Sequence, residues 1–186
     1  MKNILVVSGH PDLKNSVANK TVLEELEKNF PQAEIRKLDE LYPDYKFDVK
    51  AEQAALEKAD IIIFQFPTHW YATPGILKLY IDKVMEHGWA YGSTGNALKG
   101  KGFIVSTTVG APESLYAENA AMGHAVEDFY FGLRQYAALC GLDFKKFFYI
   151  CGAMYVPGVT TDEQKQALIE RLKKHADDIV ACLKSL

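Results

Sequence analysis

Residues 60–84 read DIIIFQFPTHWYATPGILKLYIDKV, and this stretch decides the fold. Ile61–Phe66 is a short run of branched and aromatic residues, which is typical of a strand buried on both faces of a parallel sheet. Thr73 and Pro74 predict the start of a helix, with a hydroxyl at the cap and proline at the first helical position. Apolar residues then recur at helical spacing, at Ile76, Leu77, Tyr80, Ile81 and Val84. The stretch therefore forms a strand, a loop and a helix.

The same alternation of strand and helix continues on both sides of this stretch. Further strands are expected at Lys2–Ser8, Ala33–Leu38, Lys101–Thr108 and Phe144–Cys151. Helices are expected at Ser16–Asn29, Val49–Lys58, Pro74–His87, Glu127–Cys140 and from Thr160, where a capping box reaches Glu163. This alternation predicts one α/β domain, residues 1–186, built on a doubly wound parallel sheet of five strands. An early switch point gives the flavodoxin-like strand order 2-1-3-4-5, with helices on both faces.

Composition and charge exclude several classes of protein. The chain has 186 residues, 48% of them hydrophobic, and a net charge of −3, whereas a nucleic-acid-binding domain is expected to carry a basic surface. No apolar stretch approaches the roughly 18 residues of a membrane span, and the first residues are typical of a strand rather than a signal peptide. Cys140, Cys151 and Cys182 are far apart and predict free thiols in a reducing cytoplasm. The histidines lack the spacing of metal ligands, so no metal site is expected.

The loops after the first, third and fourth strands should meet at one edge of the sheet, because open α/β sheets bind ligands at the carboxyl ends of their strands. In the first loop, His10 and Asn15 precede a helix that starts at Ser16. The backbone amides of such a helix start favour an anion, most naturally a phosphate. Neither the dinucleotide fingerprint nor the Walker A loop is present. The alternative is that Ser16 only caps the helix and His10 only turns the chain.

The other two loops carry aromatic and hydroxyl side chains. Pro67–Tyr71 contains two aromatics, an imidazole and a hydroxyl, where a plain connection would more often hold Gly, Asn or Asp. Thr107–Tyr116 begins with two hydroxyls and continues into a turn whose backbone amides suit a flat heteroaromatic ring. The alternative for both loops is that their aromatic side chains only cover apolar surface.

Motifs in these loops resemble those of one known family. They are QFPxxWYxxPxxLK at residues 65–78, HPxxxNSxANK at 10–20 and TTxG at 107–110. From Met1 to the region of Leu183, the chain resembles the small flavodoxin-like NAD(P)H dehydrogenase (quinone) family. That family includes soluble quinone reductases, stress-related oxidoreductases and ancillary subunits of potassium efflux systems. The resemblance implies a flavin held at the three loops and a homodimer with the active site at the subunit junction.

The resemblance also assigns roles to individual residues. It places the flavin phosphate at His10, Ser16, Val17 and Asn19. It places the isoalloxazine ring along Pro67, Thr68, His69, Trp70 and Tyr71, with Thr107, Thr108, Gly110 and Tyr116 at its other side. Tyr116 and the backbone amide of Gly110 are the expected catalytic groups, because they would stabilise negative charge on the reduced flavin.

Two positions depart from the family pattern. Val109 stands where the family often has a glycine, which reduces backbone flexibility there. Met122 stands where the larger quinone reductases carry a histidine, and His124 is only a weak substitute. The chain also lacks the carboxy-terminal extension of the larger enzymes, which favours FMN over FAD as the cofactor. The choice between NADH and NADPH stays open.

The function that the resemblance implies is NAD(P)H:quinone oxidoreduction. A flavin would take hydride from NAD(P)H and pass two electrons to a quinone in a ping-pong sequence. One alternative is an ancillary flavoprotein subunit whose partner is a membrane transporter for potassium efflux. A second alternative, a flavodoxin-type electron carrier, is disfavoured because such carriers are strongly acidic, whereas this chain has 21 Lys and Arg against 24 Asp and Glu.

Overall fold

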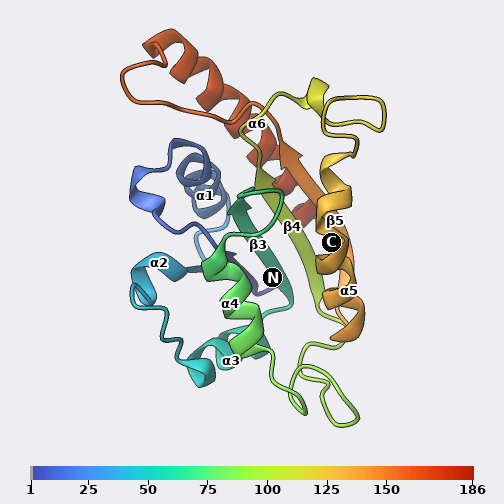
Figure 1. Ribbon diagram of the computed structural model, residues 1–186. Helices are drawn as coiled ribbons and strands as arrows, with labels where there is room; N and C mark the ends of the chain where they lie inside the picture. The colour runs from blue at the N-terminus through green and yellow to red at the C-terminus, as the bar shows by residue number, and fades with distance from the viewer. Residues whose placement is uncertain (1) are drawn as a thin grey trace.

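Five parallel strands form the centre of the molecule, in the order β2-β1-β3-β4-β5 that the sequence predicts (Figure 1). The computed structural model describes residues 2–186. The strands are β1 (Ile4–Ser8), β2 (Glu34–Lys37), β3 (Ile61–Pro67), β4 (Gly102–Thr108) and β5 (Asp143–Ile150). Because β1 lies between β2 and β3, the strand order reverses there, and this is the switch point of the sheet.

Helices cover both faces of the sheet (Figure 1). One face packs against α1 (Val17–Asn29) and α6 (Asp162–Ser185). The other face packs against α3 (Val49–Lys58), α4 (Gly75–Val84) and α5 (Phe131–Leu139). The connections hold one short helix, α2 (Leu38–Leu41), and the 3-10 helices η1 (Leu13–Asn15), η2 (Glu113–Leu115) and η3 (Val126–Tyr130). Each face therefore has its own apolar core, which burial stabilises.

The position of each strand in the sheet explains its sequence pattern. β3 is buried along its whole length, so apart from Gln65 its residues are apolar on both faces and no alternation is visible. β2 forms an edge, and its residues are exposed or half-buried, which agrees with the polar edge strand that the sequence predicts.

The sheet becomes polar on one face near the carboxyl ends of its strands. The register places Ser8 beside Gln65, and Gln65 beside Ser106. Side chains two residues apart in a strand share a face, so this row lies on the side of α1 and α6. Two residues earlier the same face is apolar, with Val6, Ile63 and Ile104 in its core. The row marks the end of the apolar core and the beginning of the loops.

Two helices differ from the prediction at their boundaries, and α4 ends at Val84 rather than at about His87. α4 starts at Gly75, and Pro74 rather than Thr73 precedes it, without a side-chain cap. The segment predicted as one helix from Glu127 to Cys140 is the 3-10 helix η3 followed directly by α5.

The start of α6 is also one residue later than predicted. Thr161 caps the helix by accepting from the N–H of Gln164, and the Gln164 side chain accepts from the N–H of Thr161. Thr160, the predicted cap, instead accepts a hydrogen bond from the N–H of Val156 at 2.8 Å. Among residues 2–186, no helix has the length and apolar character that a membrane crossing requires.

Candidate functional site

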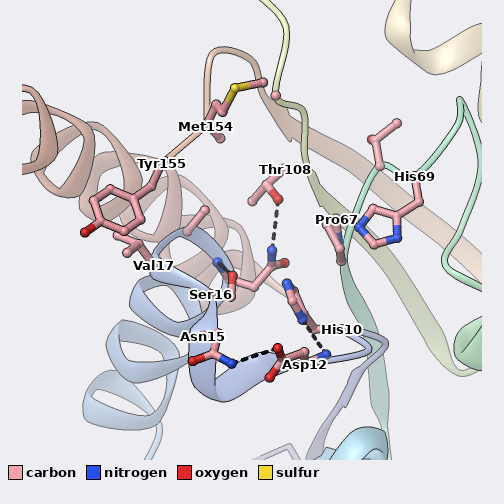
Figure 2. Close-up of a pocket in the computed structure, with 15 residues that line it drawn as sticks. His10, Asp12, Asn15, Ser16, Val17, Pro67, His69, Thr108, Met154 and Tyr155 are labelled. Carbon is pink, nitrogen blue, oxygen red and sulfur yellow. Dashed lines mark hydrogen bonds between the residues drawn. The ribbon is translucent and has the colours of Figure 1, made fainter. Parts of the chain in front are cut away.

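A cavity of about 360 Å³ lies at the carboxyl edge of the sheet, where the loops after β1, β3, β4 and β5 meet (Figure 2). Most of the predicted site residues line it: His10, Ser16, Val17, Asn19, Pro67, Thr68, His69, Thr108 and Gly110. Four predicted residues do not line it: Trp70, Tyr71, Thr107 and Tyr116. The cavity therefore unites parts of all three predicted loops.

The first turn of α1 borders the cavity. Ser16 is its N-cap, and the Ser16 Oγ accepts from the N–H of Asn19 at 3.1 Å. The N–H groups of Val17 and Ala18 come before the first donors of the helix ladder, so neither has an intrahelical acceptor. A helix start of this kind favours an anion. Ser16 does cap the helix, as the alternative proposed, and the cap leaves the next two amides available to a ligand.

His10 is held as a neutral hydrogen-bond donor. The N–H of Asp12 donates to His10 Nδ1 at 2.9 Å, which leaves the proton of the neutral ring on Nε2 (Figure 2). Burial, and then the nearby His69, lowers the pKa of His10 against the opposing effect of Asp39 and Asp12. The His10 and His69 rings meet edge to face, with centroids 6.5 Å apart. His10 therefore offers Nε2–H to a ligand rather than a fixed positive charge.

One acidic side chain also lines this part of the cavity, and the sequence analysis did not select it. Asp12 accepts a hydrogen bond from Asn15 Nδ2 at 2.8 Å (Figure 2). The bond engages one carboxylate oxygen of Asp12 with the side chain of Asn15. Asp12 and Asn15 thus shape the loop, and the donors to an anion come from His10 and the helix backbone.

The second loop turns tightly at Trp70 and Tyr71. His69 and Ala72 exchange two backbone hydrogen bonds of 3.0 Å, and φ is 50° at Trp70 and 61° at Tyr71. Left-handed backbone costs a residue with a side chain roughly 1–2 kcal/mol, and Asn and Gly usually make such turns. Because the Trp70 side chain is 93% exposed, it does not cover the core. A strained turn that presents bulky aromatics indicates a binding role.

The ring of Phe129 lies near three other rings, those of Tyr71, Tyr116 and His124. Its ring centroid lies 5.1 Å from that of Tyr71, 6.2 Å from that of Tyr116 and 5.7 Å from that of His124. The Tyr71 hydroxyl donates to Met122 Sδ at 3.4 Å. Burial, with smaller effects of Cys151 and Tyr71, raises the pKa of Tyr116, so its hydroxyl keeps its proton at neutral pH. Tyr116 does not line the cavity. It belongs to an aromatic cluster around Phe129 that also includes Tyr71 of the second loop.

The hydroxyls of the third loop face different surroundings. Thr107 is fully buried, and its Oγ1 lies 3.0 Å from Thr68 Oγ1, which in turn accepts from the Tyr130 hydroxyl at 2.6 Å. The hydroxyls of Thr107 and Thr68 are thus hydrogen-bonded to each other and to the Tyr130 hydroxyl. Thr108 lines the cavity, and its Oγ1 accepts from Asn19 Nδ2 at 3.0 Å (Figure 2). Of these threonines, Thr108 has the hydroxyl that is free to meet a ligand.

The loop after β5 forms a fourth wall of the cavity, and the sequence analysis missed it. Ala153, Met154 and Tyr155 line the cavity, and Figure 2 shows Met154 and Tyr155 on the side opposite His69. A side chain at Gly110 would lie 3.2 Å from Met154 Cε, so this loop and the third loop are in close contact. The signal was available, because β5 ends at the same edge of the sheet as β4.

The same contact explains the valine that departs from the family pattern. The N–H of Val109 donates to the carbonyl of Ile150, and the carbonyl of Val109 accepts from the N–H of Ala153, both at 2.8 Å. Val109 is buried and continues the pairing of β4 with the end of β5. Its backbone has a regular partner on that side and does not require the freedom of glycine.

A family model described as a flavodoxin-like fold matches residues 2–176. The chain belongs to this flavodoxin-like family. It is 41% identical over 175 residues to the glutathione-regulated potassium-efflux system ancillary protein KefF of Enterobacter sp. (strain 638), a match that covers 94% of this chain and 96% of KefF.

Solved structures support the same assignment. General stress protein 14 of Treponema denticola, solved in complex with FMN, is 28% identical to this chain with a TM-score of 0.85, over 98% of this chain and 99% of that protein. An NADPH-quinone reductase from P. pentosaceus has a TM-score of 0.76 at 23% identity, over 95% of this chain and 98% of its own, and shows the same fold.

Proposed function

We propose that this protein is an FMN-dependent NAD(P)H:quinone oxidoreductase. One observation carries the proposal: free helix amides, a neutral imidazole and a free hydroxyl line a single cavity at the carboxyl edge of the sheet. These donors suit a phosphate and the polar edge of a flat ring. The FMN complex of general stress protein 14, which spans nearly the same length, supports the choice of FMN. The reaction class, NAD(P)H:quinone oxidoreduction, rests on the resemblance of the motifs at residues 10–20, 65–78 and 107–110 to those of the NAD(P)H dehydrogenase (quinone) family.

The cavity offers a distinct set of groups to each part of FMN. The amides of Val17 and Ala18, together with Ser16 and the His10 Nε2–H, would hold the phosphate. The isoalloxazine ring would extend along Pro67, Thr68 and His69 towards Thr108 and Gly110, and beyond the cavity lining to Trp70 and Tyr71. Asn19 would support Thr108 through its hydrogen bond. FMN supplies the hydride chemistry when bound, taking two electrons from NADPH or NADH and returning them to a quinone.

Two groups of the protein are proposed to assist the reaction. The Gly110 N–H and the Tyr116 hydroxyl would donate hydrogen bonds where negative charge develops, and fixed donors of this kind need no reorganisation during the reaction. The raised pKa of Tyr116 keeps that hydroxyl a donor. The exposed Trp70 and its neighbour Tyr71 would provide stacking surfaces for the nicotinamide and for a flat acceptor.

The absorption spectrum of the purified protein tests the cofactor. We expect a flavin spectrum, or binding of added FMN at micromolar concentration, and chromatography of the heat-released flavin separates FMN from the alternative, FAD. Oxidation of NADPH and of NADH by a benzoquinone is then measured with the holoprotein, and with the apoprotein as control. A protein that binds neither flavin would contradict the proposal.

A second function is favoured by the match to KefF. KefF is named as an ancillary protein of a potassium-efflux system, and this chain aligns with nearly all of it. The chain would then bind a membrane transporter, and its flavin chemistry would be secondary. Steady quinone turnover without a partner favours the enzyme, whereas potassium efflux that requires the protein, but not its turnover, favours the ancillary role. The cytoplasmic location stays a prediction.

We also propose a homodimer. Phe131 and Leu139 of α5 are 65% and 64% exposed, and an apolar groove lined by Ile81, Leu133 and Tyr136 lies between α4 and α5. Exposed large apolar side chains on a helix that also lines an apolar groove are consistent with a surface that meets a partner. Sedimentation at micromolar concentration tests the dimer, and Phe131→Lys should shift it towards monomer. A monomeric wild-type protein would contradict a shared active site.

A further inference from the structure

A chain of buried hydrogen bonds leads from the centre of the sheet to the cavity. Gln65 Nε2 donates to Asn19 Oδ1 at 2.9 Å, and Asn19 Nδ2 donates to Thr108 Oγ1 at 3.0 Å. Gln65 is 0%, Asn19 1% and Thr108 4% exposed, so the three side chains are shielded from bulk water. They come from β3, α1 and β4, three elements that surround the switch point. Of the three, Thr108 ends β4, and it lies at the cavity end of the chain.

The direction of these bonds fixes the role of the Thr108 hydroxyl. A hydroxyl has one proton and two lone pairs, and Thr108 Oγ1 already accepts from Asn19. Its carbonyl is also engaged, because it accepts from the N–H of Thr68 at 2.8 Å. The Thr108 proton therefore remains for a ligand. FMN carries many acceptor atoms, in its carbonyl oxygens, ring nitrogens and phosphate.

We propose that Gln65 and Asn19 are positioning residues that present the Thr108 hydroxyl to FMN as a hydrogen-bond donor. This inference rests on the proposed function, because it requires that FMN binds in the cavity. Asn19 also lines the cavity, but both ends of its side-chain amide are bonded to protein, so it acts through Thr108 and not as a ligand. Gln65 Nε2 donates to Asn19 Oδ1 and so leaves Asn19 Nδ2 to donate to Thr108, whereas the buried Gln65 Oε1 has no hydrogen-bond partner in the described part of the chain. The sequence resemblance placed Asn19 at the phosphate, and the geometry assigns it this different role.

A double-mutant cycle on FMN affinity tests the inference. Thr108→Val removes the hydroxyl at constant shape, and Asn19→Leu removes the group that orients it. One hydrogen bond corresponds to roughly a tenfold change in the dissociation constant, so we expect about tenfold weaker binding for Thr108→Val and slightly less for Asn19→Leu. Because both variants lose the same bond, the double variant should be no weaker than about tenfold. Thr108→Ser keeps the hydroxyl and should bind FMN like the wild type.

Flavin fluorescence quenching by the apoprotein gives each dissociation constant, and urea unfolding of the apoprotein shows whether each variant folds. Gln53→Leu is the matched control, because Gln53 is also a buried amide, which donates to the carbonyl of Val84 and to Glu86 away from the cavity. It should lower stability but leave FMN affinity unchanged. If Asn19→Leu does not fold, Gln65→Met enters the same cycle with the same expectation.

The outcomes separate this inference from the proposed function. If the wild type does not bind FMN, the proposed function fails. If the wild type binds FMN but the losses of Asn19→Leu and Thr108→Val multiply to about a hundredfold, Asn19 acts independently of Thr108 and the inference is overturned. Unchanged affinity in Thr108→Val also overturns it, because the hydroxyl would then have no part in binding.

Discussion

His175 should make the protein unstable in mild acid. Its side chain lies between α6 and β4, is 7% exposed, and its Nε2 lies 3.0 Å from Ser106 Oγ. The Phe148 ring meets it edge to face at 6.3 Å. Burial lowers the pKa of His175 to about 4, and Asp178 opposes this effect only in part. The folded protein therefore holds this imidazole neutral over the range in which a free histidine takes up a proton.

The size and direction of the effect come from the difference between the folded and unfolded states. The unfolded chain binds the proton near pH 6.5 and the folded protein near pH 4, so the unfolded state binds more protons in between. The stability is fully present above pH 6.5 and is lost as the pH falls towards 4. Integration of this difference from pH 7 to pH 5 gives a loss of about 2 kcal/mol in the free energy of unfolding.

Urea unfolding at pH 7, 6 and 5 measures the loss in the wild type and in His175→Gln, whose neutral amide still reaches Ser106. Other groups, including His10, titrate in both proteins, so the difference between the two pH profiles isolates His175. The wild type should lose about 2 kcal/mol more than the variant between pH 7 and pH 5. His124→Gln, at a histidine whose side chain is 65% exposed, is the control for replacing an imidazole by an amide elsewhere in the chain. Parallel profiles for wild type and His175→Gln would refute the argument.

Gly9→Ala should lower the free energy of unfolding by about 1–3 kcal/mol in a denaturant titration, because the new Cβ would lie 2.7 Å from Leu77 Cβ; unchanged stability would mean that α4 moves away without cost. His10→Ala with Ser16→Ala should weaken FMN binding by about 1.5–3 kcal/mol for each lost charged hydrogen bond, and Ser16→Ala also removes a cap worth about 1 kcal/mol of stability. An unchanged FMN titration would place the phosphate elsewhere. Tyr116→Phe should retain FMN but slow its reduction by NADPH or NADH about tenfold, or about 1.4 kcal/mol, in stopped-flow absorbance; equal rates would leave the Gly110 amide as the proposed donor.

The sequence pattern was sufficient for the fold because the strands differ in burial. The run Ile61–Phe66, apolar except for Gln65, identified β3, and the polar run that includes Glu34–Lys37 identified an edge. The start of α6 was not predictable, because Thr160 with Glu163 and Thr161 with Gln164 form two overlapping capping boxes. The structure selects Thr161 through a contact between Thr160 and the preceding loop, which local sequence does not contain.

The sequence predicted which loops form the site, but it did not predict the role of each residue in them. Thr107 and Thr108 are neighbours in sequence, and alternation along a strand places their side chains on opposite faces. Which of them meets the cavity depends on Asn19 in α1, more than 80 residues away in the chain. The position of β5 at the same edge of the sheet as β4 indicated a fourth loop there, but only the packing of that loop against Gly110 shows that Met154 and Tyr155 line the cavity.

The row of Ser8, Gln65 and Ser106 shows how one face of the sheet serves both the fold and the site. A buried polar pair contributes little net stability, and apolar side chains of the same shape can replace it at almost no cost. The bond between Ser106 and His175 connects β4 to α6, and neither residue lines the cavity of the candidate site, so its expected effect is on packing and on stability in acid. The bond from Gln65 continues through Asn19 and ends at the cavity. Stability alone does not require the second chain, and its position at the cavity wall is explained if the polar groups orient a donor to the ligand.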